Sequence, residues 1–385
     1  MRLALLSTDD RENRRCYSAE YPIVPTPQTA LLQGLGKHHD WEVHFISCLQ
    51  QPVNAPKKLG DNIWYHALQV PKIGWMRTGY QGCIRAVRRK LREIGPDIVH
   101  GQGTERDCGI CAVFSGYPNV LTIHGNMAAL ARQFRARPGS YLWLTGFLEN
   151  FTVPRTGGVL CNSAYTEELV STRNRRTWRV PNPVREAFWG PARARRTGDR
   201  PRLVNVGVIG PRKRQLEILA MFKRLHEQGH GFQIEFIGHV DEHEKYGQAF
   251  LDAIRHATEQ GYGIYSGTKD IDPLIAALDQ ADGCIHFPLE EAFGLVVVET
   301  LARNLKFFGA RVGGIVDIAE SVEGAELFPA EDWSGLEEGL RRWKQAGCPR
   351  PENAAQVMAK RYHPRVIAEK HLEIYREVIS SRRQG

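Results

Sequence analysis

The most informative stretch of the sequence runs Pro288-Leu289-Glu290-Glu291-Ala292-Phe293-Gly294-Leu295-Val296-Val297-Val298-Glu299. It follows an apolar run typical of a buried strand, turns at Phe293-Gly294, and then takes on a helical pattern. The amides at the start of such a helix can bind an anion such as a diphosphate. Glu291 precedes the helix and Glu299 lies inside it, so the two carboxylates can accept hydrogen bonds from different hydroxyl groups of one ligand. The structural alternative is one acid favoured by the helix dipole and one exposed helical acid.

The order of strand and helix in this stretch repeats along the whole chain. In the first half, strands are predicted at Leu3–Leu6, Trp41–Ile46, Ile98–His100, Val120–His124 and Gly158–Cys161. In the second half, they are predicted at Leu203–Val206, Gln233–Ile237, Ile264–Ser266, Gly283–His286 and Leu305–Phe308. Amphipathic helical patterns alternate with these strands, among them Gly82–Ile94, Gln215–Glu227 and Gln248–Glu259. The alternation predicts an α/β fold of parallel sheets covered by helices.

The length of the chain, 385 residues, suits two domains of ordinary size. Residues 1–182 and residues 203–362 are each predicted to form a Rossmann-like, doubly wound domain. Residues 183–202 are rich in Arg, Pro and Gly and lack periodicity, which indicates a linker. Residues 363–385 are predicted to form a last helix that packs back toward the first domain. Doubly wound domains bind ligands at the carboxyl ends of their strands, so two facing domains are expected to share an interdomain cleft.

The chain carries a formal net charge of +8, which favours anionic partners such as nucleotide phosphates or a lipid headgroup surface. No zinc-finger spacing or RNA-recognition signature accompanies the charge, so we expect no nucleic-acid partner. No apolar run is long enough to span a membrane, and the apolar part of the N-terminus is too short for a secretory signal. We therefore expect a cytoplasmic protein.

Eight cysteines are scattered along the chain, and only Cys108 and Cys111 form a C-x-x-C pair. A second such pair, which a zinc site would need, is missing from the sequence. The spacing suggests one face of a helix, and packed thiols are favoured over a redox or metal role.

Several segments resemble, in order along the chain, the signature of retaining GT-B glycosyltransferases, in particular glycosyltransferase family 4. The central one is Glu291, seven intervening residues and Glu299, with Phe293-Gly294-Leu295 between them. The others are Asp97-Ile98-Val99-His100, Thr122-Ile123-His124-Gly125, Asn162-Ser163, Val180-Pro181-Asn182, Val206-Gly207-Val208, Pro211-Arg212-Lys213 and Gly313-Gly314-Ile315-Val316-Asp317. This resemblance covers nearly the whole chain and implies the GT-B fold, with the donor in the second domain and the acceptor in the first.

The resemblance also implies roles for individual residues. Glu291 is expected to contact hydroxyls of the donor sugar, and Glu299 to contact the ribose. Lys213 and Arg212 are expected to neutralise the diphosphate, which gains negative charge as the glycosidic bond breaks. The phosphate or sugar oxygens are expected to accept hydrogen bonds from the amides of three residues, namely Phe293, Gly294 and Leu295. His124 is expected near the reacting end of the donor, which makes Glu291, His124 and Lys213 the candidate catalytic residues.

The activity implied is hexosyl transfer, with retention of configuration, from a nucleotide-diphosphate sugar to a hydroxyl group. UDP- or GDP-sugars are the expected donors, no further cofactor is expected, and the acceptor is a glycan, a lipid-linked molecule or a small molecule. Two alternatives stay open: a nucleotide-sugar epimerase of the same architecture, and a non-catalytic nucleotide-sugar binding protein. The structural alternatives are a solvated cation for Lys213 and a hydrogen-bonded histidine at a strand end for His124.

The chain departs from the family pattern at several positions. Val208 stands where the family has an arginine, so one phosphate contact is either lost or supplied by Arg212 or Arg214. A glycine pair after the first strand is replaced by Pro25-Thr26-Pro27-Gln28, which makes close approach of the backbone to the donor less easy. These changes bear on the identity of the donor.

Two helix starts are predicted from side chains that can cap the first turn. Thr26 precedes Pro27, and Asp272 precedes Pro273, as expected for N-cap residues. Asp272 also belongs to Asp270-Ile271-Asp272, a D-x-D string that binds a metal–nucleotide pair in other proteins. The capping interpretation is favoured, and no catalytic metal is expected because Lys213 and helix amides supply the positive charge.

The segment from Arg132 to Phe151 combines three arginines with a run of aromatic and aliphatic residues. Such a segment can rest on a membrane surface or contact a lipid-linked acceptor. The alternative, a core helix preceded by basic residues, is slightly favoured. The first interpretation would place the protein at the inner face of the membrane as a peripheral protein.

Overall fold

The structure, a computed structural model, describes residues 1–192 and 200–383 and divides into two compact units. Unit 1 comprises Met1–Arg185 together with the C-terminal segment that begins at Pro364, and unit 2 comprises Glu186–His363. The predicted linker, 183–202, contains residues 193–199, which lie outside the described residues. Its described part includes a short 3-10 helix, η4 (Glu186–Trp189), which belongs to unit 2.

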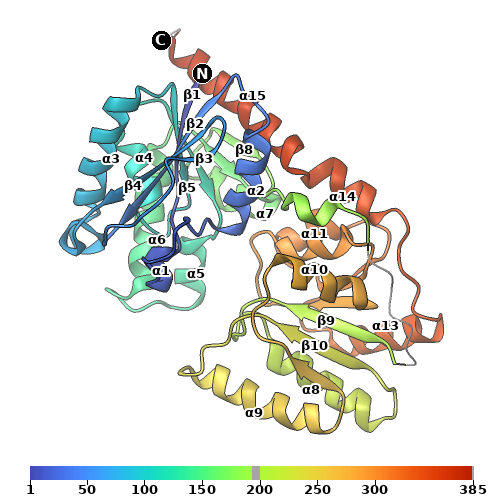
Figure 1. Cartoon of the computed structure of the whole chain (residues 1–385). Helices are drawn as coiled ribbons and strands as arrows, with labels where there is room; N and C mark the ends of the chain where they lie inside the picture. Colours follow the sequence, from blue (N-terminus) through green and yellow to red (C-terminus); the bar gives the residue numbers. More distant parts are fainter. Residues whose placement is uncertain (193–199, 384–385) are drawn as a thin grey trace. The chain divides into compact units, whose positions relative to one another are not determined.

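Among the described residues of unit 1, eight strands form one sheet in the order β3-β4-β2-β1-β5-β6-β7-β8 (Figure 1). Every neighbouring pair is parallel except β3 with β4. The strands are β1 (Arg2–Leu6), β2 (Glu42–Leu49), β3 (Lys58–Gly60), β4 (Ile63–Gln69), β5 (Ile98–Gln102), β6 (Asn119–Ile123), β7 (Val159–Cys161) and β8 (Thr177–Arg179). The chain direction across the sheet reverses between β1 and β5, which makes their carboxyl ends a topological switch point.

The helices of unit 1 cover both faces of this sheet (Figure 1). They are α1 (Arg11–Arg14), α2 (Thr26–Leu35), α3 (Gln81–Ile94), α4 (Asp107–Val113), α5 (Met127–Gln133), α6 (Tyr141–Thr152), α7 (Ala164–Ser171) and α15 (Pro364–Arg383), with 3-10 helices η1 (Lys72–Gly74), η2 (Met76–Thr78) and η3 (Val153–Arg155). Alternate residues of a strand face opposite sides, so Leu3 and Leu5 pack with α2 and α15, while Ala4 and Leu6 pack with α3 and α4.

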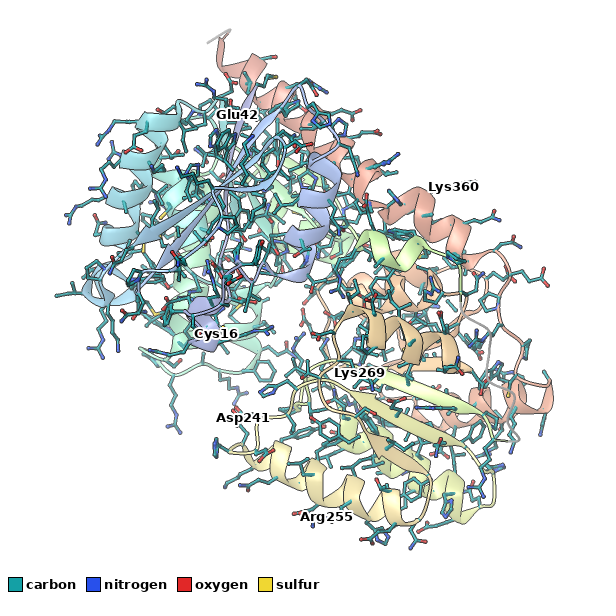
Figure 2. The ribbon with its side chains drawn as sticks, in the orientation of Figure 1. Cys16, Glu42, Asp241, Arg255, Lys269 and Lys360 are labelled. Atoms are coloured by element: carbon teal, nitrogen blue, oxygen red, sulfur yellow. The ribbon has the colours of Figure 1, made fainter. Side chains whose placement is uncertain are left out.

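Six described strands of unit 2 form an all-parallel sheet in the order β11-β10-β9-β12-β13-β14. They are β9 (Arg202–Val206), β10 (Gln233–Ile237), β11 (Gly263–Tyr265), β12 (Gly283–His286), β13 (Lys306–Ala310) and β14 (Ala325–Phe328). The helices are α8 (Gln215–Glu227), α9 (Lys245–Glu259), α10 (Ile271–Gln280), α11 (Leu295–Leu301), α12 (Gly314–Ala319), α13 (Trp333–Gln345) and α14 (Ala354–Tyr362). The switch point lies between β9 and β12. Charged side chains such as Arg255 and Lys360 point outward from this unit (Figure 2).

The two predicted helix caps are wrong in detail. Thr26 is already inside α2, whose N-cap position is Pro25, and Asp272 lies in the first turn of α10, whose N-cap position is Asp270. In both cases no side chain caps the helix, because these helices begin one or two residues earlier than the hydroxyl or carboxyl group suggested. Strands β3, β4, β8 and β14 were also not predicted. Length alone does not explain these misses, because β4 has seven residues and the three-residue strands β7 and β11 were predicted.

No helix among the described residues is both long and apolar enough to cross a membrane.

Candidate active site

Two loops meet at the switch point of unit 2. Residues 207–214 follow β9 and residues 287–294 follow β12, and these two strands are paired in parallel. The amide of Leu289 donates a hydrogen bond of 2.9 Å to the carbonyl of Arg212, which ties the loops together. The carboxyl edge of a doubly wound sheet at its switch point is where such folds bind ligands, and both loops carry predicted site residues.

The structure brings Lys213 and Glu291 into direct contact. The ammonium of Lys213 donates a hydrogen bond to Oε2 of Glu291, and the two side chains form an ion pair. His286, the last residue of β12, bonds the same carboxylate oxygen through Nε2 at 3.0 Å. Sequence analysis did not single out His286, although its position at the end of the strand before the motif was a usable signal. A cation and an imidazole thus hold the Glu291 carboxylate in one position.

Burial and charge decide the ionisation of this cluster. Burial raises the pKa of Glu291, but Lys213 and His286 outweigh it and hold that pKa well below its ordinary value. Burial, and secondly Lys213, lower the pKa of His286, so its imidazole is neutral at pH 7. Burial also lowers the pKa of Lys213, against the opposing effect of Glu291. Since Nε2 of His286 faces a carboxylate, we assign its proton there, and Nδ1 has no hydrogen-bond partner among the described residues.

The two arginines beside Lys213 face different partners. Arg212 is partly exposed and donates to the carbonyl and the carboxylate of Glu290. Arg214 has a left-handed backbone (φ 60°) and is buried, with its guanidinium bonded to the carbonyl of Ala330 and the carboxylate of Glu331. These bonds stabilise a backbone conformation that costs energy for a residue other than glycine. Arg214 is therefore held in the turn next to Lys213 by Ala330 and Glu331, whereas the guanidinium of Arg212 is partly exposed.

The amides for which the sequence predicts anion binding lie at the start of α11. Gly294 is its N-cap residue with φ 97°, and the amides of Phe293, Gly294 and Leu295 donate no hydrogen bond to any described residue. Gly314 lets α12 approach this turn closely, because a Cβ at that position would lie 2.5 Å from the carbonyl oxygen of Ala292. Unbonded amides at a helix start attract negative charge.

Glu299 lies in the second turn of α11 and is 6% exposed. The structural alternative of an exposed helical acid is therefore wrong for this residue. Burying a carboxylate is unfavourable unless it is hydrogen-bonded or binds a ligand.

His124, the remaining candidate, lies in unit 1 at the end of β6. It lines a cavity of about 440 Å³ at the switch point of that unit, together with Thr8, Asn13, Pro25, Pro27, Gln28, Gln102, Glu105, Arg106, Cys108 and Tyr141. Its Nε2 lies 2.8 Å from Oε1 of Gln102 and 2.9 Å from Nε2 of Gln28. Burial, and secondly His371, lower the pKa of His124 to about 4, so it is neutral at pH 7.

Sequence analysis missed the polar groups around His124. Gln102 ends β5, and Glu105 follows in the loop between β5 and α4. The amide of Gly125 donates a 3.0 Å hydrogen bond to the Glu105 carboxylate, and burial raises the pKa of that carboxyl to about 6. A usable signal was the run of polar residues directly after a strand at a switch point. These groups give the cavity hydrogen-bond donors and acceptors suited to a hydroxylated ligand.

Comparison with protein families assigns both halves of the chain. Residues 29–188 match the model described as Glycosyltransferase Family 4, and residues 191–361 match the model described as Glycosyl transferases group 1. None of the curated protein sequences matches the chain.

Many solved structures share the fold over the full length of the chain. Sucrose-phosphate synthase from Thermosynechococcus elongatus is 16% identical with a TM-score of 0.76, and the match covers 99% of this chain and 100% of that one. HepE from Anabaena in complex with UDP-glucose is 13% identical with a TM-score of 0.70, covering 99% and 100%. Starch synthase IV from Arabidopsis thaliana, bound to ADP and acarbose, is 12% identical with a TM-score of 0.69, covering 98% and 99%. The chain has the two-domain GT-B fold and belongs to the family 4 type of glycosyltransferases.

Proposed function

We propose that the protein is a retaining hexosyltransferase that uses a nucleotide-diphosphate sugar, with UDP- and GDP-sugars as the first candidates. The observation that carries the proposal is the buried contact of Lys213 with Glu291 at the switch point of unit 2. A cation and a carboxylate in one place match a ligand that carries both phosphates and sugar hydroxyls. One protein of the same fold, HepE from Anabaena, was crystallised with UDP and with UDP-glucose, which supports a donor of this class.

In this proposal the chain stabilises the leaving diphosphate. The bond between the anomeric carbon and the phosphate oxygen breaks, and the electron pair stays on the diphosphate. Lys213, Arg212 and the free amides at the start of α11 neutralise the charge that develops there. Glu291 holds the sugar through its hydroxyls, while Glu299 holds the ribose.

The acceptor hydroxyl attacks the same face of the sugar from which the diphosphate departs, which retains the configuration. Its proton passes to an oxygen of the leaving phosphate, so the residues of the chain need no covalent intermediate. The cavity around His124 in unit 1 is the proposed acceptor site, because its amide and carboxylate groups can orient a hydroxylated molecule. The donor reaction in this scheme uses no metal ion and no further cofactor.

A thermal-shift screen against UDP-, GDP- and ADP-sugars tests the donor assignment. A ligand at 100 times its dissociation constant stabilises the folded chain by about 2.7 kcal/mol, which shifts the melting temperature measurably. If the sugars of one nucleotide stabilise the protein and those of the other nucleotides do not, the nucleotide of the donor is identified. The absence of a shift with any nucleotide sugar contradicts the proposal.

The donor that binds is then incubated alone with the protein. A transferase slowly hydrolyses its donor, whereas an epimerase releases an isomer of the sugar and a binding protein leaves the donor unchanged. Product analysis by nuclear magnetic resonance separates these outcomes. With an acceptor present, the anomeric configuration of the glycoside formed decides retention.

We also propose that α5 and α6 rest on an anionic membrane, where a lipid-linked acceptor would be presented. Phe134, Tyr141 and Phe147 are 50%, 56% and 60% exposed, and the rings of Trp143 and Phe147 stack with centroids 5.9 Å apart. The exposed residues of the same segment include three arginines, Arg132, Arg135 and Arg137. Exposed aromatic rings can insert at the headgroup level of a bilayer, and neighbouring arginines can bind its anionic headgroups. Tyr141 links this aromatic face to the acceptor cavity, which it also lines.

A further inference from the structure

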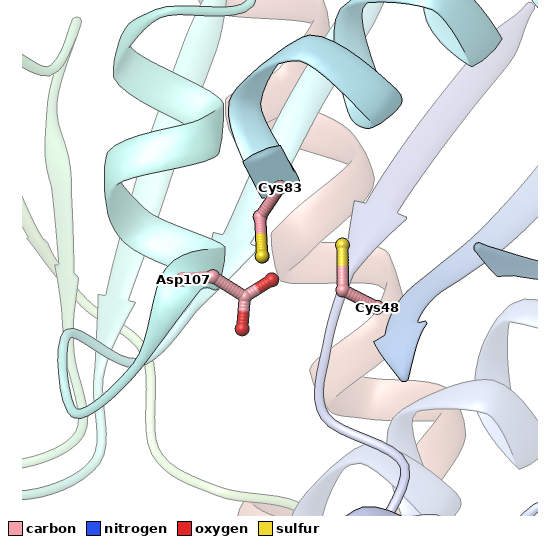
Figure 3. A group of neighbouring side chains, drawn as sticks. All are labelled: Cys48, Cys83 and Asp107. Atoms are coloured by element: carbon pink, nitrogen blue, oxygen red, sulfur yellow. The ribbon is translucent and has the colours of Figure 1, made fainter. Parts of the chain in front are cut away.

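Three side chains from distant parts of unit 1 meet in its core. Cys48 lies near the end of β2, Cys83 in the first turn of α3, and Asp107 at the start of α4. The two Sγ atoms and a carboxylate oxygen of Asp107 lie within 4.8 Å of one another. Figure 3 shows the three side chains pointing toward a common centre, and all three residues are at most 5% exposed.

We propose that Cys48, Cys83 and Asp107 bind a zinc ion. Zinc takes thiolate sulfur at about 2.3 Å and carboxylate oxygen at about 2.0–2.2 Å, so tetrahedral ligand atoms lie about 3.5–3.8 Å apart. The three ligand atoms lie within 4.8 Å of one another, so each pair must close by at most about 1 Å to reach that spacing. Two sulfur ligands favour zinc over magnesium or calcium, which prefer oxygen. Both cysteines are free, so no disulfide occupies them.

The charges around the cluster also favour a bound cation. Asp107 is buried, and no lysine, arginine or histidine of the described residues forms an ion pair with it. Its carboxylate is hydrogen-bonded to the Cys48 side chain, but a buried carboxylate without a paired cation is unfavourable, and a divalent cation would remove that cost. Zinc with two thiolates and one carboxylate leaves one net negative charge, and with Cys111 as a third thiolate it leaves two; Arg106, next to Asp107 in the sequence, supplies one balancing charge.

Helix α4 carries a further thiol, Cys111, whose Sγ lies outside the 4.8 Å cluster and would have to move closer to fill the fourth position. Cys111 lies one turn after Asp107, on the same face of the helix, and is buried and free. The site would join β2, α3 and α4, which are separated by many residues in the sequence. It would also fix the loop that carries Glu105 and Arg106 into the acceptor cavity. We therefore assign the ion a structural role in unit 1, separate from the donor reaction in unit 2.

The first test measures the metal content of the full-length protein purified from zinc-supplemented cells. Inductively coupled plasma mass spectrometry should find one zinc per chain. After the zinc is exchanged for cobalt, the absorption spectrum should show a thiolate-to-cobalt charge-transfer band and the visible bands of tetrahedral cobalt. Neither measurement depends on a variant or on activity. A metal-free protein without a cobalt spectrum overturns the proposal, as does a disulfide between Cys48 and Cys83, detected as an intact mass lower by two hydrogens and located by mass spectrometry of the unreduced peptides.

Single variants then locate the ion. Cys83→Ser should lose the bound zinc, and Asp107→Asn should bind it at least about tenfold more weakly in competition with a chelator. Cys161→Ser is the matched control, because Cys161 is an equally buried free thiol in β7 of the same unit. Zinc retained by Cys83→Ser, or lost from Cys161→Ser, would place the ion elsewhere and contradict the assignment.

Discussion

The ammonium of Lys213 is paired with the carboxylate of Glu291, 78 positions away in the sequence, and both side chains are nearly buried. In the proposed donor complex this ion pair opens, because Lys213 contacts the diphosphate and Glu291 contacts the sugar. In this proposal, Glu291 compensates the charge of Lys213 in the free protein until the donor binds. A buried cation without a partner would otherwise be costly.

The two glutamates of the motif should respond differently to substitution. Glu299→Gln should weaken the binding of both donor and free nucleoside diphosphate, because the ribose does not react. Glu291→Gln should spare nucleoside diphosphate binding and lower the turnover of the bound sugar. A lost hydrogen bond to a charged group is worth about 1.5–3 kcal/mol, or about ten- to more than hundredfold. Calorimetry with the nucleoside diphosphate and kinetics with the donor measure the two effects.

The reverse result is that Glu291→Gln weakens nucleotide binding and Glu299→Gln does not. It would mean that the donor lies in the opposite direction along the motif. If neither substitution changes binding or turnover, the motif is structural and the transferase proposal fails.

Removing the cation of Lys213 should weaken diphosphate binding selectively. We expect Lys213→Met to bind the nucleoside diphosphate about ten- to hundredfold more weakly, while the nucleoside without phosphates binds unchanged. The matched control is Lys223→Met in α8. This lysine is exposed, and its Nζ lies 3.8 Å from Oε1 of Glu227, an exposed residue of the same helix. Equal loss in both variants, or none in Lys213→Met, would argue against Lys213 as the phosphate ligand.

Transfer from the donor should not depend on a divalent cation. Lys213, Arg212 and the amides at the start of α11 supply positive charge beside the proposed diphosphate position. A brief EDTA treatment should therefore leave donor hydrolysis or transfer largely unchanged, with zinc content measured in the same sample. Activity that collapses in EDTA and returns with magnesium or manganese would show that the leaving group needs a metal.

The aromatic face of α5 and α6 should carry membrane binding. The protein should sediment with anionic vesicles and be released by salt, since salt screens the arginines. Trp143→Ser with Phe147→Ser should reduce the bound fraction, whereas Ile73→Ser should not, although Ile73 is 80% exposed on η1. Recovery of the unmodified protein in the supernatant with and without vesicles would refute membrane contact.

Stability should fall as the pH drops below about 6.5. His371 on α15 is buried against the rings of His100 and Tyr375, and its Nδ1 bonds the carbonyl of Ile367. Burial lowers the pKa of His371 to about 4, with Lys370 lowering it further and the Ile367 carbonyl opposing. The unfolded chain therefore takes up this proton at higher pH than the folded chain. The contribution of His371 to the free energy of unfolding is thus fully present above pH 6.5 and is lost as the pH falls toward 4.

A pKa shift of this size lowers the free energy of unfolding by about 2 kcal/mol between pH 7 and pH 5. Scanning calorimetry at the two pH values should show a smaller drop for His371→Gln than for the unmodified protein. His39→Gln, which changes an exposed histidine after α2, should keep the full drop. An unchanged pH dependence in His371→Gln would remove this histidine from the explanation.

The sequence by itself determined the two-domain α/β fold and its family. The reason is local, because period-two apolar runs and helical patterns alternate along the chain, and turns such as Phe293-Gly294 need residues that tolerate left-handed backbone. Those signals survive in any stretch long enough to show a period. They failed to predict the strands β3, β4, β8 and β14, and they misplaced the first residues of α2 and α10, where a single residue decides the boundary.

Only the tertiary structure decided which side chains face one another. Lys213 follows β9 and contacts Glu291, which follows β12, because these two strands are neighbours in the sheet. His286, at the end of β12, contacts the same carboxylate. The guanidinium of Arg214 is bonded instead to Ala330 and Glu331. Cys48, Cys83 and Asp107 met for the same reason. Contacts between residues far apart in sequence depend on strand order and on the packing of whole elements, and no local pattern of residues encodes either.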